Sequence, residues 1–244
     1  MPGLITMPNK TVLVTGSSDG IGFEVVKIFL RNSYNVIAHY FRSPKKLNQI
    51  KSNSLHLIQE DFSAIDNLRF FALNCKKISS VDILINNSAF FHYDNNINET
   101  NNETIVKYVN VNLIAPFILC QEFSKNMSIK KYGKIVNVSS VSVKHGGSPS
   151  SALYTITKSA LEQMTRTLSK SFAKNNININ TVRVGVTDTA FHNKNPRKDM
   201  IERVKLIPLN RIANPCEVAT IIYELTTEKF SFCTGGVYDI TGGE

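Results

Sequence analysis

The stretch Thr15-Gly16-Ser17-Ser18-Asp19-Gly20-Ile21-Gly22 follows a short apolar run, Thr11–Thr15, and precedes a segment of helical spacing, Gly22–Asn32. A strand, a glycine-rich turn and a helix in this order are typical of dinucleotide binding. Gly16 permits the tight turn, Gly20 lets the backbone approach a pyrophosphate, and Gly22 lets the helix pack against the strand. We expect all seven residues, Gly16, Ser17, Ser18, Asp19, Gly20, Ile21 and Gly22, to cradle a dinucleotide, the alternative being a purely structural turn.

Short β-branched runs alternate with longer amphipathic segments along the whole chain. The predicted strands are Thr11–Thr15, Asn35–His39, Leu55–Ile58, Val81–Ile85, Lys134–Val138, Ile177–Val184 and Gly236–Ile240. The predicted helices are Gly22–Asn32, Asn67–Lys77, Thr104–Met127, Tyr154–Ala173 and Pro215–Thr227. This alternation predicts a Rossmann-type α/β fold, a doubly wound parallel sheet of seven strands with helices on both faces, in one domain of residues 1–244.

Composition excludes several classes of protein. The net charge is +9, but no compact basic helix or basic and aromatic stripe of a nucleic-acid binder is present, so we expect no nucleic-acid partner. The four cysteines are far apart, which predicts buried, reduced thiols and no metal site. The N-terminus does not resemble a signal peptide, and no run of about 18 apolar residues occurs. We therefore expect a cytoplasmic protein with no membrane partner.

The end of the second predicted strand bears on the choice of nicotinamide cofactor. A site selective for NAD usually places a carboxylate there, to accept hydrogen bonds from the ribose 2′-hydroxyl. Residues 36–46 contain no Asp or Glu but include Arg42, whose guanidinium is suited to a 2′-phosphate. We predict NADP(H), with NAD(H) as the alternative. Asp19 argues against this choice, because it is an acid within the cradle.

Two further loops follow predicted strands and face the same edge of the sheet. Asp61 and Phe62, after the third strand, are expected to hold the adenine, with the carboxylate accepting from its exocyclic amine. Asn87 and Ser88, after the fourth strand, are small and polar and suit the ribose of the nicotinamide. Asp and Asn are also ordinary turn and cap residues, so each of these signals is weak alone.

Three side chains after the fifth strand suggest acid–base chemistry. Ser140 follows the fifth predicted strand, and Tyr154 and Lys158 lie four residues apart in the next helical segment. An i, i+4 pair shares one helix face, so the ammonium can lie near the phenol. A nearby ammonium together with oxidised nicotinamide is expected to lower the phenol pKa from its ordinary value near 10.

These motifs together resemble the short-chain dehydrogenase/reductase family over essentially the full chain. The matching residues are Thr15-Gly-x-x-x-Gly-Ile-Gly22, Asn86-Asn87-Ser88-Ala89, Asn112, Ser140, Tyr154-x-x-x-Lys158, and Gly185 followed by Thr189. The resemblance implies that Tyr154 exchanges the proton, that Ser140 polarises the carbonyl, and that Lys158 lowers the tyrosine pKa and holds the ribose. It implies that Asn112 interrupts its helix and binds a relay water.

The resemblance also assigns the loop after the sixth strand to the nicotinamide carboxamide, through Val186, Thr187 and Thr189. The chain departs from the family pattern at three positions: Val184 replaces a Pro, Ala89 replaces a Gly, and Thr241 replaces an Asp. None of these changes removes a catalytic group, so they bear on loop rigidity and subfamily. The family also implies a homodimer or homotetramer.

The substrate is less well defined. Phe91, His145 and Phe191 are the expected substrate contacts, although surface aromatic residues packing under a loop are an equal alternative. The pattern is similar to 3-oxoacyl-(acyl carrier protein) reductases, which implies a ketoreductase with a small-molecule or carrier-bound carbonyl substrate. The segment His39–Ser43 is similar to pteridine reductases, which is the alternative. The basic stretch Lys194–Lys205 either selects an anionic substrate or forms a solvated helix face. A non-catalytic NADP(H) sensor or scaffold is the alternative from another class.

Overall fold

The computed structural model describes residues 10–92, 97–189 and 200–244. Within them, seven strands form one parallel sheet in the order β3-β2-β1-β4-β5-β6-β7. The strands are β1 Thr11–Val14, β2 Asn35–Tyr40, β3 Leu55–Gln59, β4 Ile83–Asn86, β5 Gly133–Ser140, β6 Ile177–Val184 and β7 Val237–Ile240. The strand order reverses between β1 and β4, where doubly wound sheets bind ligands at the carboxyl edge. The predicted fold class is confirmed, and each predicted strand is present.

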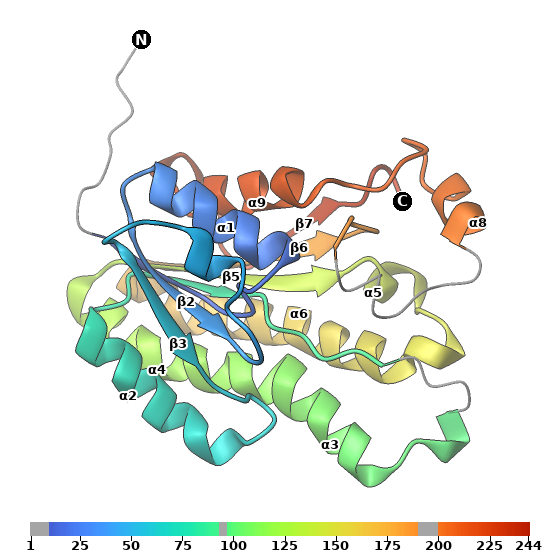
Figure 1. The fold of residues 1–244 in the computed structure, drawn as a ribbon, viewed down its shortest axis with the longest axis horizontal. Helices are drawn as coiled ribbons and strands as arrows, with labels where there is room; N and C mark the ends of the chain where they lie inside the picture. The colour runs from blue at the N-terminus through green and yellow to red at the C-terminus, as the bar shows by residue number, and fades with distance from the viewer. Residues whose placement is uncertain (1–9, 93–96, 190–199) are drawn as a thin grey trace.

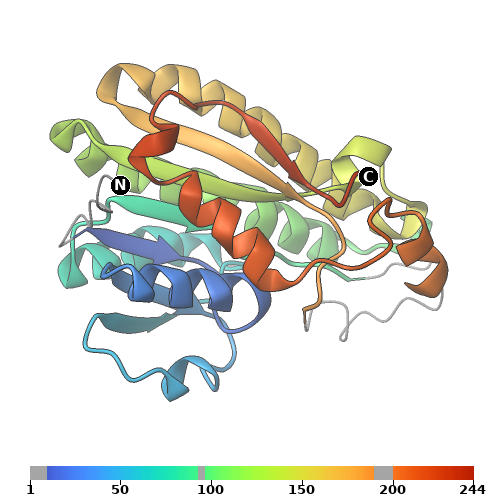
Figure 2. The same cartoon turned by 90° about the horizontal axis from the view of Figure 1, so that it is seen from above.

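Helices cover both faces of this sheet (Figures 1 and 2). The helices are α1 Gly20–Arg31, α2 Leu68–Ile78, α3 Asn102–Val109, α4 Ala115–Lys130, α5 Ser142–His145, α6 Ala152–Phe172, α8 Met200–Lys205 and α9 Pro215–Glu224. Because side chains alternate along a strand, Val12 and Val14 pack in the core with α1 and α9, whereas Leu13 packs in a second core with α2 and α4. These two apolar layers fix the sheet between the helices.

The predicted helix Thr104–Met127 is divided in the structure. A π-helical turn, Asn110–Ile114, separates α3 from α4. At the end of this turn, the N–H of Ala115 donates a hydrogen bond to the carbonyl of Asn110. The physical reason is Pro116: it has no N–H and cannot donate to the carbonyl of Asn112, as an α-helix requires. The turn places Asn112 in the fully buried interior.

By length and composition, one helical stretch in the described part of the chain, Asn102–Lys130, is long and apolar enough to cross a membrane. It includes the buried Glu122, which accepts hydrogen bonds from Arg69 and Lys76 of α2 and forms an ion pair with Lys125. Core helices of globular proteins pass the same test, and this one packs on α2 and α6. We interpret it as a core helix.

The cysteines differ in part from the expectation. All four are free thiols, and burial raises the pKa of Cys75 and of Cys120 to about 12. Cys216 is exposed and Cys233 half-buried, so the expectation of four buried thiols is wrong for these two. Among the residues that the structure describes, no group of His, Cys, Asp and Glu is arranged to hold a metal ion.

Candidate active site

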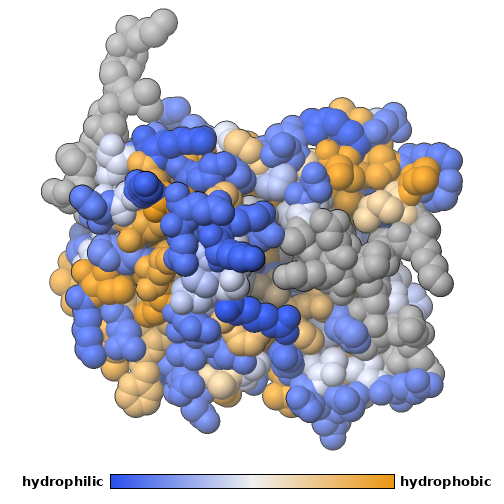
Figure 3. Space-filling model, viewed as in Figure 1, coloured by the Kyte–Doolittle hydropathy of each residue, from blue (hydrophilic) through white to orange (hydrophobic). Residues whose placement is uncertain are grey.

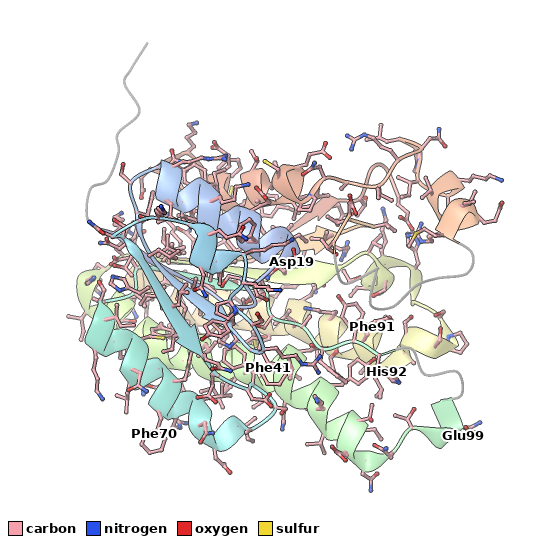
Figure 4. All side chains as sticks on the ribbon, viewed as in Figure 1. Asp19, Phe41, Phe70, Phe91, His92 and Glu99 are labelled. Carbon is pink, nitrogen blue, oxygen red and sulfur yellow. The ribbon has the colours of Figure 1, made fainter. Side chains whose placement is uncertain are left out.

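A pocket of about 1050 Å³ opens along the carboxyl edge of the sheet. It is lined by the turn after β1 and by the loops after β2, β4, β5 and β6. Pockets for drug-sized ligands hold roughly 300–1,000 Å³, so this one has room for a dinucleotide and a small substrate together. Figure 4 shows Asp19 at the start of α1 and Phe91 and His92 in the loop after β4, across this edge.

The cradle after β1 requires glycine at two positions. Gly16 has a φ of +64°, and a Cβ there would lie 2.9 Å from the Cα of Ser88. A Cβ on Gly22 would lie 2.6 Å from Asn87 Nδ2 and closer still to the Gly16 carbonyl. Both positions therefore keep the turn against the loop after β4, and the shape fits a group that needs close backbone approach.

Asn87 and Ser88 fasten that loop to the cradle. Asn87 Nδ2 donates to the carbonyls of Thr15 and Gly16, each at 3.0 Å. The backbone N–H groups of Asn87 and Ser88 donate to Thr15 Oγ1 at 2.9 and 3.0 Å. Both residues also line the pocket, and their contacts with a ribose remain a prediction. Since the Asn87 amide is committed to the turn, its side chain sets the shape of the site.

The structure divides the predicted cradle residues into two groups. Gly16, Ser18, Asp19, Gly20 and Ile21 line the pocket. Ser17 and Gly22 are buried beneath the turn and are not part of the lining, so we place them as supports of the cradle. Ser17 Oγ donates to the carbonyl of His39 at 2.7 Å, which explains why it faces inward.

His39 supports the cradle, a role that the sequence did not reveal. Its Nδ1 accepts from Gly16 N–H at 3.2 Å, and its Nε2 donates to the Glu60 carbonyl at 3.0 Å. The ring stacks on Phe62 at 4.0 Å, with an interplanar angle of 2°. These partners need the neutral imidazole, and burial lowers the pKa of His39 to about 4. The signal that the sequence offered for this role was a histidine within the apolar run of β2.

Protonation of His39 is expected to destabilise the protein in acid. The unfolded His39 takes up its proton near pH 6.5, whereas the folded one resists until about pH 4. The contribution of the neutral His39 to the free energy of unfolding is therefore complete above pH 6.5. It falls by about 3 kcal/mol as the pH drops to 4. The free energy of unfolding, measured by urea denaturation, should differ less between pH 4.5 and pH 7.5 in His39→Gln than in the wild type. His56→Gln, at an exposed position on β3, is the control. If His39→Gln loses as much unfolding free energy between the two pH values as the wild type, this role of His39 is contradicted.

Arg42, predicted to bind a 2′-phosphate, lines the pocket and is exposed. Among the described residues it forms no ion pair, so its guanidinium is available to a ligand. Asp19 caps α1 by accepting from Gly20 N–H at 2.8 Å, and it forms an ion pair with Lys46. Lys46 thereby offsets the negative charge that argued against a phosphate in the cradle.

The predicted adenine contacts, Asp61 and Phe62, lie outside the pocket lining. Phe62 is buried against His39 and Phe71, and Asp61 Oδ1 accepts from Ser63 N–H at 2.9 Å. The Phe62 ring belongs to the core between β2 and α2, so adenine binding by Asp61 and Phe62 remains a prediction. Position after a strand does not tell which face a side chain takes.

Ser140, Tyr154 and Lys158 all line this pocket. Ser140 ends β5, and a hydrogen bond joins it to the phenol of Tyr154 near the start of α6. Lys158 follows one turn later, is 2% exposed, and donates to the carbonyl of Val138 at 2.7 Å. Its Nζ lies 5.7 Å from the centre of the Tyr154 ring. One strand end and one helix face thus hold a proton donor, a polarising hydroxyl and a cation.

The pKa of Tyr154 lies above its ordinary value of 10. Burial raises it to about 12, while the hydrogen bond from Ser140 acts in the opposite direction. Burial also lowers the pKa of Lys158 to about 8. Desolvation disfavours both the phenolate and the ammonium, so it shifts each group toward its neutral form. Tyr154 is therefore a protonated phenol at neutral pH, the form that donates a proton.

Asn112 lies next to this group and holds a loop. Its Oδ1 accepts from Phe90 N–H at 2.7 Å, and its Nδ2 donates to the Phe90 carbonyl at 3.0 Å. Nδ2 also lies 3.1 Å from Thr157 Oγ1 on α6. These bonds fix the start of the loop that carries Phe91, whose ring contacts Tyr154 edge to face at 5.1 Å. The Asn112 side chain therefore positions the wall of the pocket, while its predicted water relay remains a prediction.

The remaining predicted residues lie around the pocket. Val186, Thr187 and Thr189 line it on the β6 side, and Phe91 and His145 line the other end. Phe191 lies outside the described residues. Sequence reasoning missed Lys107 and Glu244, which also line the pocket, and named Arg203 only as part of a basic stretch. Figure 3 shows apolar side chains gathered on the surface near α8. Ile201 and Leu206 are exposed apolar residues of this segment, and Leu206 borders the pocket.

Comparison with known proteins agrees with this geometry. A family model described as short chain dehydrogenase matches residues 10–200. The uncharacterized oxidoreductase YmfI of Bacillus subtilis is 30% identical over 242 residues, with 96% of this chain and 98% of that protein covered. The 3-oxoacyl-(acyl-carrier-protein) reductase FabG of Rickettsia conorii is 31% identical, with 98% of each covered. A 4-hydroxyisoleucine dehydrogenase structure complexed with NADH is 32% identical, has a TM-score of 0.87, and covers 96% of this chain and 98% of its own.

Proposed function

Because this chain belongs to the short-chain dehydrogenase/reductase family, we propose that it reduces a ketone to a secondary alcohol with NADP(H) as the hydride carrier. The observation that carries the proposal is the meeting of Tyr154, Ser140 and Lys158 with the glycine cradle in one pocket. A site that joins a nucleotide cradle to a buried proton donor suits hydride transfer coupled to proton transfer.

The residues of the site have separate roles in this reaction. Bound nicotinamide supplies the hydride, which is the chemistry that the protein itself lacks. Tyr154 donates its phenolic proton to the substrate oxygen, and the raised pKa keeps that proton in place until the oxygen becomes basic. Ser140 donates a hydrogen bond to the same oxygen. Lys158 stabilises the resulting phenolate, and its lowered pKa allows it to exchange a proton near neutral pH.

The preference for NADP(H) rests on charge around the adenosine end of the pocket. Arg42 is exposed and unpaired among the described residues, and Lys46 offsets Asp19. Arg42→Ala should weaken NADPH binding by about 30-fold and NADH binding by no more than about two-fold, since a charge-assisted bond to the 2′-phosphate is lost. Nicotinamide fluorescence titration measures both constants.

Arg31→Ala is the matched control for this titration. Arg31 is an exposed arginine in the last turn of α1, and its removal lowers the overall charge by the same amount. Equal weakening of NADPH and NADH by Arg42→Ala would mean that Arg42 does not read the 2′-phosphate. Equal weakening of NADPH by both variants would mean that long-range charge alone is at work.

Two substrate types follow from the proposal. A 3-oxoacyl chain on a carrier is supported by the similarity to FabG proteins at about 30% identity and by the apolar wall around Phe91. A pterin is the alternative, supported by the aromatic residue after Asn86-Asn87-Ser88-Ala89. Ser140 favours the ketone, because a hydroxyl polarises a carbonyl oxygen by donating to it.

The remaining expectations are part of the same proposal. A non-catalytic NADP(H) scaffold would have no use for the hydrogen bond between Tyr154 and Ser140, so we place the protein among the enzymes. We also propose a cytoplasmic homodimer or homotetramer without nucleic-acid or membrane partners. Support for self-association comes from the exposed apolar side chains Phe117 and Ile129 on α4 and Ile156 on α6.

A further inference from the structure

A charged cluster lies on the substrate side of the pocket. Arg203 of α8 forms an ion pair with Glu244, which follows β7, and each side chain is only 10% exposed. Lys144 of α5 donates to the backbone carbonyl of Glu244 at 2.6 Å, and His145 Nε2 lies 3.6 Å from Glu244 Oε1. Arg203, His145 and Glu244 line the same pocket as Tyr154 and Ser140.

The ion pair leaves one donor and one acceptor unused. It joins Arg203 Nη2 to Glu244 Oε1, whereas Arg203 Nη1 and Glu244 Oε2 are buried and have no hydrogen-bond partner in the part of the chain that the structure describes. Buried polar atoms are nearly always paired, and an arginine and a carboxylate usually pair through two parallel bonds. A pair that served only to fasten α8 to the C-terminal turn would gain from that two-bond geometry. The spare atoms therefore point to a ligand.

The charges of the spare atoms define the ligand. Arg203 offers a cationic donor, and Glu244 offers an anionic acceptor, within a pair that is neutral overall. A simple carboxylate would pair with Arg203 but would leave Glu244 without a donor beside a second negative charge. An uncharged ketone would leave both atoms unpaired. A group that carries a carboxylate and an ammonium side by side provides a charged partner for each.

We propose that Arg203 and Glu244 bind the carboxylate and the ammonium, respectively, of an oxo- or hydroxy-amino acid, whose ketone or alcohol carbon faces Tyr154. This substrate class rests on the proposed oxidoreductase function and chooses a compact polar substrate over a long acyl chain. The carboxylate binds Arg203 Nη1 and the ammonium binds Glu244 Oε2. Lys144 is engaged by the Glu244 backbone carbonyl, which leaves the Glu244 side chain to accept from the ammonium.

The test compares three ketones with NADPH: 2-amino-4-oxopentanoate, 4-oxopentanoate, which lacks the ammonium, and 2-pentanone, which lacks both charges. We expect kcat/KM to fall along this series by about ten-fold or more at each step, because each step leaves one buried charge without its partner. A dihydropterin and a 3-oxobutanoyl thioester are included as competing substrates. Preference for either of these, or equal use of the three ketones, overturns the proposal.

Substitutions test whether the preference for the amino-oxo acid depends on Arg203 and Glu244. Arg203→Gln should lower kcat/KM for the amino-oxo acid by about 30-fold or more relative to 2-pentanone, mainly through KM. Glu244→Gln should remove the advantage of the amino-oxo acid over 4-oxopentanoate. Lys205→Gln is the control, since it removes one exposed charge from the same helix. If Arg203→Gln lowers kcat/KM equally for all substrates, Arg203 only holds α8 to the C-terminal turn, and the proposed subsite is contradicted.

Calorimetric binding of 2-amino-4-oxopentanoate separates the subsite from the proposed reaction. If no ketone is reduced, the oxidoreductase proposal fails, whereas binding that Arg203→Gln abolishes still supports the subsite. If 2-pentanone and the thioester are reduced but the amino-oxo acid does not bind, the reaction is supported and the subsite is overturned.

Discussion

Replacement of Tyr154 with Phe lowers kcat for ketone reduction by about 1,000-fold while NADPH binding changes little. The physical reason is that the phenol supplies the proton to the substrate oxygen, and a positioned general acid contributes about 100- to 10,000-fold. The ring itself remains, so its edge-to-face contact with Phe91 at 5.1 Å is kept. Steady-state loss of reduced-nicotinamide absorbance measures kcat, and fluorescence titration measures NADPH binding.

Tyr132→Phe is the matched control for this variant. Tyr132 precedes β5 at the opposite edge of the sheet, where its ring lies under the ammonium of Lys10 at 3.2 Å. Loss of its hydroxyl leaves that ring contact and the pocket intact, so kcat should remain near the wild-type value. Turnover by Tyr154→Phe at the rate of the control would assign the proton to another group.

Gly22→Ala is expected to abolish NADPH binding, with Kd raised by at least about 100-fold. The added Cβ would lie 2.6 Å from Asn87 Nδ2 and 2.9 Å from the Cα of Ser17, and closer still to the Gly16 carbonyl. Alanine normally stabilises a helix interior by about 1 kcal/mol over glycine. That gain is outweighed, because two of these neighbours are backbone atoms and only a shift of the whole cradle relieves the overlap.

Gly146→Ala controls for the addition of a methyl group. A Cβ at Gly146 would meet open space, and its φ of +78° limits the effect to a backbone cost of about 1–2 kcal/mol. Thermal denaturation and NADPH titration of both variants separate stability from binding. Wild-type NADPH affinity in folded Gly22→Ala would mean that the turn after β1 is not the cofactor cradle.

Features that depend on local sequence were predictable. The turn from Gly16 to Gly22 lies between a strand and a helix, and its chemistry depends on neighbours in the chain. Tyr154 and Lys158 are one helical turn apart, so their shared face follows from spacing alone. The division of the helix around Asn112 also has a local cause, because Pro116 removes one α-helical donor.

Features that depend on depth or on distant contacts were not predictable. His39 joins Gly16 to Glu60 across three segments, and no periodicity indicates that pairing. Arg203 and Glu244 are 41 residues apart, and only the packing of α8 beside the C-terminal turn joins them. Burial raises the pKa of the Tyr154 phenol, and the sequence does not show how far a side chain is desolvated.

The most direct test of the account is the consumption of NADPH by the purified wild-type protein in the presence of the ketone panel. We expect saturable binding of NADPH, and its oxidation in step with formation of one mole of alcohol per mole of cofactor. Binding of NADPH without oxidation by any ketone, thioester or pterin would contradict it and would favour a non-catalytic scaffold.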